Sequence, residues 1–128
     1  MSADCPFCRL DHAVLKNELA YALFDTHPVN PGHLLILPKR HVASYFEATA
    51  EEKSALLALL EVAKRLLDEQ YAPDGYNIGV NVGEVAGQTI PHLHLHLIPR
   101  YLGDVAQPRG GVRGVIPDKQ SYPEENTP

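Results

Sequence analysis

The hydrophobic and polar positions of this 128-residue chain alternate most regularly between residues 91 and 99. Three histidines, His92, His94 and His96, stand two residues apart there, with a leucine after each. Successive side chains of a β-strand point to opposite faces, so this alternation is typical of a strand that is buried on one side. We therefore predict a strand that carries the three imidazole rings on one face and the leucines in the core.

Other segments also have the pattern of strands. Residues 19–25 and 33–38 are apolar and flank a turn with two prolines and a glycine, so we predict that they pair as antiparallel neighbours. The second of them is a nearly continuous apolar run, which predicts burial on both faces. Residues 76–83 alternate small or amide side chains with larger apolar ones, a pattern that suits a ligand lying against one face. A weaker strand is predicted near residues 10–18.

The longest predicted element is one helix over about residues 50–71. Thr49 and Glu52 have the spacing of a capping box at its start. Leucines and alanines then recur at helical spacing and form one apolar stripe. We expect the charged residues of this helix to form a solvated surface, with Glu61 and Arg65 as an i, i+4 pair.

Composition narrows the class of protein. Hydrophobic residues make up 45% of the chain and charged residues 21%, as in ordinary globular proteins. We predict a single domain over residues 1–128, with an irregular extension from about residue 104, where glycines and prolines recur. The net charge of -5 argues against a broad nucleic-acid-binding surface. We also expect no membrane span and no secretory signal, and hence a cytoplasmic protein, because no long apolar run is present.

Two cysteines add a candidate metal site. Cys5 and Cys8 form a C-x2-C pair, a spacing that occurs in zinc sites and in redox pairs. In the cytoplasm, metal ligands or free thiols are expected rather than a disulfide. A closed zinc site needs two further ligands, which histidines would supply because the chain has no third cysteine. The three histidines of the predicted strand are compatible with metal ligation and with nucleophilic chemistry.

Residues 92–98 resemble the signature of the histidine triad (HIT) superfamily of nucleotide hydrolases and transferases, in which three histidines alternate with apolar residues. The resemblance covers roughly residues 5–104. It implies an α+β, HIT-like fold with a mainly antiparallel five-stranded sheet and one long helix, usually assembled as a homodimer. The related positions outside the triad are Asp25, residues 30–33, residues 38–41, Asn81 and residues 87–89.

The resemblance also implies a mechanism. His94 would attack the α-phosphorus of a nucleotide and form a covalent nucleotidyl-histidine that water then cleaves, since neutral imidazole is a competent nucleophile near pH 7. His96 would donate to the phosphate or the leaving group, and His33 would orient the catalytic face. Further nucleotide contacts are implied at Asp25 for the ribose and at Asn81, Gln88 and Thr89 for the phosphoryl oxygens.

The metal implied by the resemblance is zinc. In zinc-carrying members of the superfamily, an N-terminal C-x2-C pair, a later histidine and the first triad histidine hold the ion. Those positions are Cys5, Cys8, His41 and His92 in this chain. The expected cofactor is therefore one structural Zn²⁺ per chain.

Several substrates remain open within the superfamily. Residues 98–100 and Gly103-Asp104 resemble the dinucleoside polyphosphate hydrolase branch, and the chain has no tryptophan, which the phosphoramidase branch typically carries near its C-terminus. An AMP-containing dinucleoside polyphosphate is therefore the expected substrate. The alternatives are an adenosine phosphoramidase-type hydrolase, phosphorolysis or nucleotidyl transfer, a zinc hydrolase with the three triad histidines as ligands, and a non-catalytic nucleotide-binding module. His12 and His27 are expected at the surface, without a role.

Overall fold

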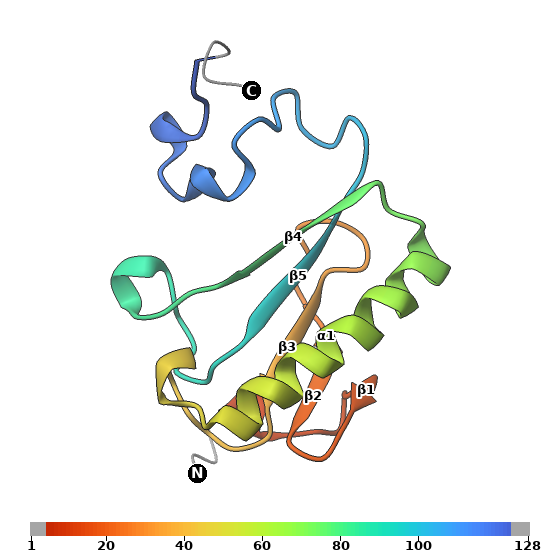
Figure 1. The fold of residues 1–128 in the computed structure, drawn as a ribbon, viewed down its shortest axis with the longest axis vertical. Helices are drawn as coiled ribbons and strands as arrows, with labels where there is room; N and C mark the ends of the chain where they lie inside the picture. The colour runs from red at the N-terminus through yellow and green to blue at the C-terminus, as the bar shows by residue number, and fades with distance from the viewer. Residues whose placement is uncertain (1–4, 124–128) are drawn as a thin grey trace.

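The computed structural model describes residues 5–123. Its centre is a five-stranded sheet in the order β1-β2-β3-β5-β4, and every neighbouring pair is antiparallel. One long helix, α1 (Ala50–Tyr71), crosses one face of the sheet (Figure 1). The strands are β1 (Leu15–Lys16), β2 (Ala20–Phe24), β3 (Leu34–Pro38), β4 (Gly75–Val80) and β5 (Leu95–Arg100). The predicted α+β fold is confirmed.

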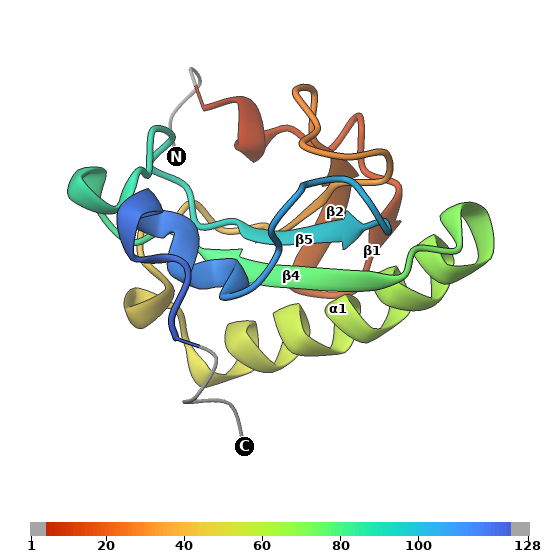
Figure 2. The same ribbon diagram turned by 90° about the horizontal axis from the view of Figure 1, so that it is seen from above.

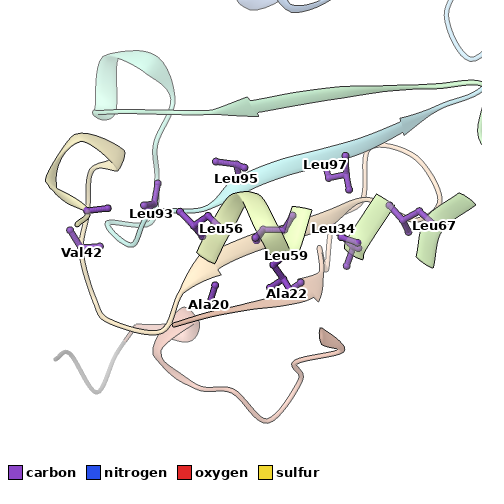
Figure 3. Packing of buried hydrophobic residues seen from close by; sticks show 13 residues of the cluster. Ala20, Ala22, Leu34, Val42, Leu56, Leu59, Leu67, Leu93, Leu95 and Leu97 are labelled. Atoms are coloured by element: carbon purple, nitrogen blue, oxygen red, sulfur yellow. The ribbon is translucent and has the colours of Figure 1, made fainter. Parts of the chain in front are cut away.

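The core lies between the helix and the sheet. Leucines at helical spacing on α1, among them Leu56 and Leu59, pack against Leu95 and Leu97 of β5, and all four are buried (Figure 3). The apolar stripe of the helix and the leucines of the triad segment therefore meet, as their two periodicities predict. The N-terminal segment and the loop between β2 and β3 lie on the side of the sheet away from α1 (Figure 2).

The β2–β3 hairpin has the predicted antiparallel pairing, and every residue of β3 is buried. Its connecting turn depends on Gly32, which has a φ of +92° and is buried under the end of α1. A Cβ atom at this position would stand 3.0 Å from Cδ2 of Tyr71 and 3.2 Å from Cγ of Pro99. Glycine is therefore needed both for the left-handed backbone and for the close approach.

The start of α1 confirms the capping box and corrects one expectation. Thr49 accepts a hydrogen bond from the Glu52 backbone, and the Glu52 carboxylate accepts one from the Thr49 backbone. Glu52 is only 5% exposed, because Arg40 donates to both of its carboxylate oxygens at 2.8 Å. The prediction that the charges of this helix are all solvated is thus wrong for Glu52.

The ion pair on the helix surface also differs from the prediction. Lys64 and Asp68 form the i, i+4 pair at 2.7 Å, and within residues 5–123 no ion pair joins Glu61 to Arg65.

The strand that carries the triad begins later than predicted. Strand β5 starts at Leu95, so His92 and His94 precede it and only His96 lies within it. Pro91 lacks a backbone N–H, and the backbone N–H of His92 donates to Ile90 in a tight turn. The chain therefore joins the sheet only after this turn. Strand β4 is also shorter than predicted and ends at Val80, before Gly83 with its φ of +91°.

Between β5 and residue 123 the chain forms only short 3-10 helices, η4 (Gly111–Val115) and η5 (Pro117–Lys119). Arg109 and Arg113 donate to backbone carbonyls of residues 119–123 and tie this extension to itself. Figure 2 places the extension beside β4. Within residues 5–123, no helix has the length and apolar character needed to cross a membrane.

Candidate active site and metal-binding cluster

The sheet face opposite α1 brings together side chains from three separate segments. His33 lies just before β3 and His96 lies in β5, two strands that pair directly. The Nε2 atom of His33 is 2.9 Å from Nδ1 of His96 and 3.6 Å from a carboxylate oxygen of Asp25, which follows β2. His94 stands next to this group, with its ring 5.1 Å from that of His96. The structure thus gathers the predicted catalytic histidines.

The hydrogen bond of His94 fixes which nitrogen can react. Its Nδ1 atom lies 2.8 Å from the backbone oxygen of His92, and a carbonyl oxygen can only accept. In the neutral ring the proton is therefore on Nδ1, and Nε2 keeps a free lone pair. Phe7 packs on the ring with centroids 5.1 Å apart and helps to hold its orientation. The Nε2 lone pair of the neutral ring is accordingly available for nucleophilic attack.

The protons of His33 and His96 follow from their neighbours in the same way. The backbone N–H of Val29 donates to Nδ1 of His33 at 3.1 Å, so the proton of the neutral His33 ring is on Nε2. That proton is donated to Nδ1 of His96, which leaves the His96 proton on its own Nε2. Burial lowers the pKa of His33, and burial together with the neighbouring histidines lowers the pKa of His96 to about 4. Both rings are neutral near pH 7, and His96 is a hydrogen-bond donor.

A cavity of about 400 Å³ opens over these residues. Its wall is apolar at Phe7, Leu23, Leu35 and Ile90, and a size of several hundred Å³ is typical of small-molecule sites. Among the polar residues that line it are Asp25, Asn81, Thr89, His94 and His96. Four of the five predicted nucleotide contacts outside the nucleophile therefore face the same space.

Gln88 is placed differently from the other predicted contacts. Its side chain accepts from the backbone of Gly83 at 2.9 Å and donates to the carbonyls of Ala43 at 2.8 Å and Ile90 at 3.2 Å. It is buried at 9% exposure and does not line the cavity. Its amide stabilises the loop that precedes the triad, because these backbone groups occupy both of its polar atoms.

Two histidines that sequence reasoning set aside also line the cavity. His12 and His27 are exposed, as predicted, but both lie on its wall. The backbone N–H of His27 donates to Asp25 at 2.9 Å, so this residue belongs to the same turn as a predicted nucleotide contact. The position of His27 two residues after Asp25 could have indicated it, whereas no pattern in the sequence points to His12.

A second cluster lies beside the cavity and contains Cys5, Cys8, His41 and His92, whose ligand atoms are all within 4.8 Å of one another. Nδ1 of His92 is 3.4 Å from Sγ of Cys5, and Nδ1 of His41 is 3.2 Å from Sγ of Cys8. Nε2 of His92 donates to the backbone oxygen of Pro38, which leaves its Nδ1 lone pair toward the sulfurs. The four residues thus form a cluster that could hold a metal ion.

The geometry argues against a catalytic metal held by all three triad histidines. Nδ1 of His92 lies among the cysteines, while Nδ1 of His94 is bound to a backbone carbonyl. Within residues 5–123, the groups whose ligand atoms converge are the Cys5 cluster and the Asp25, His33 and His96 group, and neither contains two triad histidines. In the second group, a hydrogen bond joins Nε2 of His33 to Nδ1 of His96.

Comparisons with known proteins identify the family of the chain. A model of the HIT domain family matches residues 9–103. An AP-4-A phosphorylase of Mycobacterium tuberculosis is 38% identical over 92 residues, which are 71% of this chain and 47% of that protein. A bis(5'-adenosyl)-triphosphatase of Saccharomyces cerevisiae is 36% identical over 96 residues, 74% of this chain and 47% of that protein. The chain thus matches about half the length of these curated relatives.

Solved structures show the same fold. A member of the HIT family from Bacillus subtilis superimposes with a TM-score of 0.73 at 32% identity, over 79% of this chain and 76% of that one. A zinc-bound histidine triad family protein from Mycobacterium smegmatis superimposes with a TM-score of 0.72 at 30% identity, over 81% of this chain and 80% of that one. Because the family model spans most of the chain and carries the triad, this protein belongs to the HIT family.

Proposed function

We propose that the protein hydrolyses AMP-containing dinucleoside polyphosphates through a covalent nucleotidyl-histidine at His94. The Nε2 lone pair of His94 forms a bond to the α-phosphorus while the bond from that phosphorus to the bridging oxygen breaks. The electron pair leaves with the bridging oxygen, to which Nε2–H of His96 can donate. Water then attacks the same phosphorus, and the N–P bond breaks with its electron pair returning to Nε2, which restores the neutral imidazole. The proton that the water loses passes to the solvent or to the released nucleoside monophosphate.

The observation that carries this proposal is the hydrogen bond from Nδ1 of His94 to the backbone of His92 at 2.8 Å. In the neutral ring it leaves Nε2 unprotonated, in a cavity that also contains a donor at His96 and a carboxylate at Asp25. The carboxylate supports a ribose contact, because it can accept hydrogen bonds from the 2′- and 3′-hydroxyls. Asn81 and Thr89 supply donors for the phosphoryl oxygens.

The substrate class is supported by the relatives, whose names refer to diadenosine tetraphosphate and to bis(5'-adenosyl) triphosphate. An adenosine phosphoramidate would use the same nucleophile and differ only in its leaving group, and phosphorolysis would replace water as the second acceptor. A panel of dinucleoside polyphosphates and phosphoramidates, with and without inorganic phosphate, separates these cases by kcat/KM. The proposal predicts the largest value for a dinucleoside polyphosphate with water as acceptor.

Stereochemistry at the α-phosphorus tests the mechanism. Two successive in-line displacements, first by His94 and then by water, give net retention of configuration in a substrate with a chiral α-phosphorothioate. Direct attack by water gives inversion. Retention is the expected result, and inversion would exclude the covalent intermediate.

We also propose that the cluster of Cys5, Cys8, His41 and His92 holds one structural zinc ion. Zinc bonds of about 2.3 Å to sulfur and about 2.0 Å to nitrogen place tetrahedral ligand atoms about 3.5 Å apart. The sulfur–nitrogen distances of 3.2, 3.4 and 3.6 Å in this cluster fit that spacing. Four protein ligands close the coordination shell, so the ion would join chain segments and leave no open position for substrate.

A homodimer is proposed from the edge of the sheet. Strand β4 is an edge strand, and its residue Ile78 is 50% exposed. An edge strand can pair with the same strand of a second copy about a two-fold axis. Light scattering should give about 28 kDa, twice the 14.1 kDa of one chain, and Ile78→Lys should shift the mass toward one chain. A native mass of one chain would contradict this proposal.

A further inference from the structure

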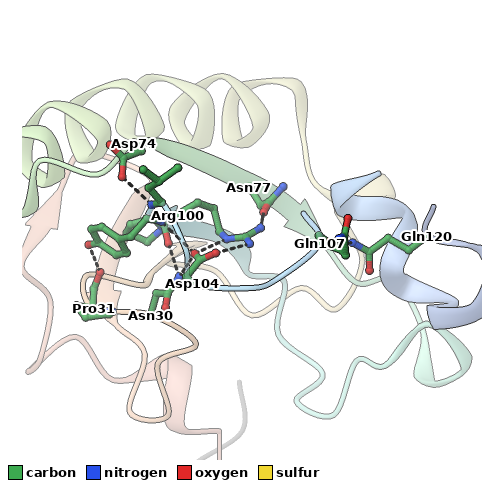
Figure 4. Close-up of polar contacts among 11 residues, drawn as sticks. Asn30, Pro31, Asp74, Asn77, Arg100, Asp104, Gln107 and Gln120 are labelled. Carbon is green, nitrogen blue, oxygen red and sulfur yellow. Dashed lines mark hydrogen bonds and ion pairs between the residues drawn. The ribbon is translucent and has the colours of Figure 1, made fainter. Parts of the chain in front are cut away.

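A network of polar side chains lies where β5 ends, four residues after His96. Arg100 donates through Nε and Nη2 to the two carboxylate oxygens of Asp104, both at 2.8 Å, and through Nη1 to Asn77 at 2.6 Å (Figure 4). One oxygen of Asp104 also accepts from the side-chain amide of Asn30 at 2.7 Å. The carboxylate therefore joins the end of β5 to the turn between β2 and β3.

Asn30 carries this attachment into the turn that precedes β3. Its amide donates to the backbone oxygen of Pro99 at 3.0 Å as well as to Asp104, so the side chain is held on two sides. Its backbone oxygen accepts from the backbone N–H of His33 at 3.2 Å. The preceding residue, Val29, donates its backbone N–H to Nδ1 of the His33 ring at 3.1 Å. The position of Asn30 thus determines whether the Val29 N–H can donate to the His33 ring.

The hydrogen bond from Val29 determines which ring nitrogen carries the proton in His33 and in His96. While Nδ1 of His33 accepts from Val29, the ring must keep its proton on Nε2 and donate it to His96, 2.9 Å away. His96 must then carry its proton on its own Nε2. If the turn moved and Val29 no longer donated, a proton could occupy Nδ1 of His33, and His96 would no longer be held in one tautomer.

We propose that Asp104, clamped by Arg100, is a positioning residue for the reaction, because it fixes the turn at Asn30 and thereby the tautomers of His33 and His96. The effect on the reaction rests on the proposed function. The effect on the tautomers does not, because it is a property of the protein without substrate. Asp104 itself acts through Asn30 and lies outside the cavity of the nucleophile.

The test is Asp104→Asn, which keeps the size of the side chain but removes the charge that holds Arg100 and one acceptor for Asn30. We expect kcat to fall by about 10-fold, since small shifts of reacting groups cost about that much or more, with little change in KM. In the ¹⁵N NMR spectrum of the histidine side chains, the native protein should show one Nε2–H tautomer for His33 and for His96. The variant should show mixed tautomers at both rings.

Asn30→Ala removes the side chain that connects Asp104 to the turn. It should give the same fall in kcat and the same mixed tautomers. If both residues act along one path, the double variant is no worse than Asn30→Ala alone, whereas independent effects would add. Asp104→Glu retains the carboxylate and should recover part of kcat.

Asp68→Asn is the matched control, because it makes the same chemical change in the i, i+4 ion pair with Lys64 on α1. It should leave the tautomers and kcat as they are in the native protein. The proposal is overturned if Asp104→Asn keeps native tautomers and native kcat, or if its loss of kcat equals its unfolded fraction in a thermal melt. If instead the proposed function is wrong, the native protein still shows the single tautomers of His33 and His96 but forms no nucleotidyl-histidine.

Discussion

At the scale of single residues, the site depends on which backbone group each histidine contacts. The oxygen of His92 holds Nδ1 of His94, the N–H of Val29 holds Nδ1 of His33, and the oxygen of Pro38 holds Nε2 of His92. Each contact needs the backbone at one position and in one direction. The turn before His33 has little room for change, because Gly32 combines a φ of +92° with close contacts to Tyr71.

Gly32→Ala should therefore lower the free energy of unfolding by about 1–3 kcal/mol, because an L-residue is strained at this φ and its Cβ meets the Tyr71 ring. Urea denaturation measures the change. Gly75→Ala is the control, since a Cβ there would meet nothing within 4 Å and its φ is not left-handed. Equal effects of the two substitutions would contradict this account of the turn.

At the scale of elements, the hydrophobic pattern was sufficient for the helix, whose apolar stripe has a helical period, and for the β2–β3 hairpin, whose two apolar runs flank a turn. It was not sufficient where a long-range polar contact decides the structure. Burial of Glu52 depends on Arg40, twelve residues earlier, and the amide of Gln88 is occupied by Ala43, far along the chain. The late start of β5 follows from the turn at Pro91, which the alternating pattern does not reveal.

The contact between Arg40 and Glu52 gives a prediction about pH. Hydrogen bonds from Arg40 lower the pKa of Glu52 from its ordinary 4.5 to about 2, so the carboxylate stabilises the fold above pH 4.5 and loses this effect as the pH falls through 2. Glu52→Gln keeps an acceptor for the helix cap but loses the ion pair. The free energy of unfolding at pH 7 should be about 1 kcal/mol lower in the variant than in the native protein, and this difference should shrink below pH 4. A difference that is independent of pH would contradict this role.

At the scale of the whole molecule, the cluster of Cys5, Cys8, His41 and His92 connects the N-terminal segment, the end of β3 and the approach to β5. The sequence could predict its four members only by resemblance to known zinc proteins. Spacing alone identified Cys5 and Cys8, whereas the choice of His41 and His92 among the histidines depends on the tertiary fold. His92 thus links the cluster to His94, the proposed nucleophile, two residues later.

Metal analysis of protein purified without added zinc should find about one zinc per chain, as expected for a closed four-ligand site. Cys5→Ser should lose the metal and melt at a lower temperature, since the ion contributes to folding. His27→Asn, which changes a histidine outside the cluster, should keep the metal. Full zinc occupancy in Cys5→Ser would remove this residue from the site.

The most direct test of the central claim is the isolation of the covalent intermediate. Protein mixed briefly with a radiolabelled adenylated substrate and quenched in base should carry label on the peptide that contains His94, located by mass spectrometry. His94→Asn should carry none, while His12→Asn, which changes another histidine on the cavity wall, should form the adduct. Native protein that turns substrate over without acquiring label on His94 would contradict the proposed mechanism.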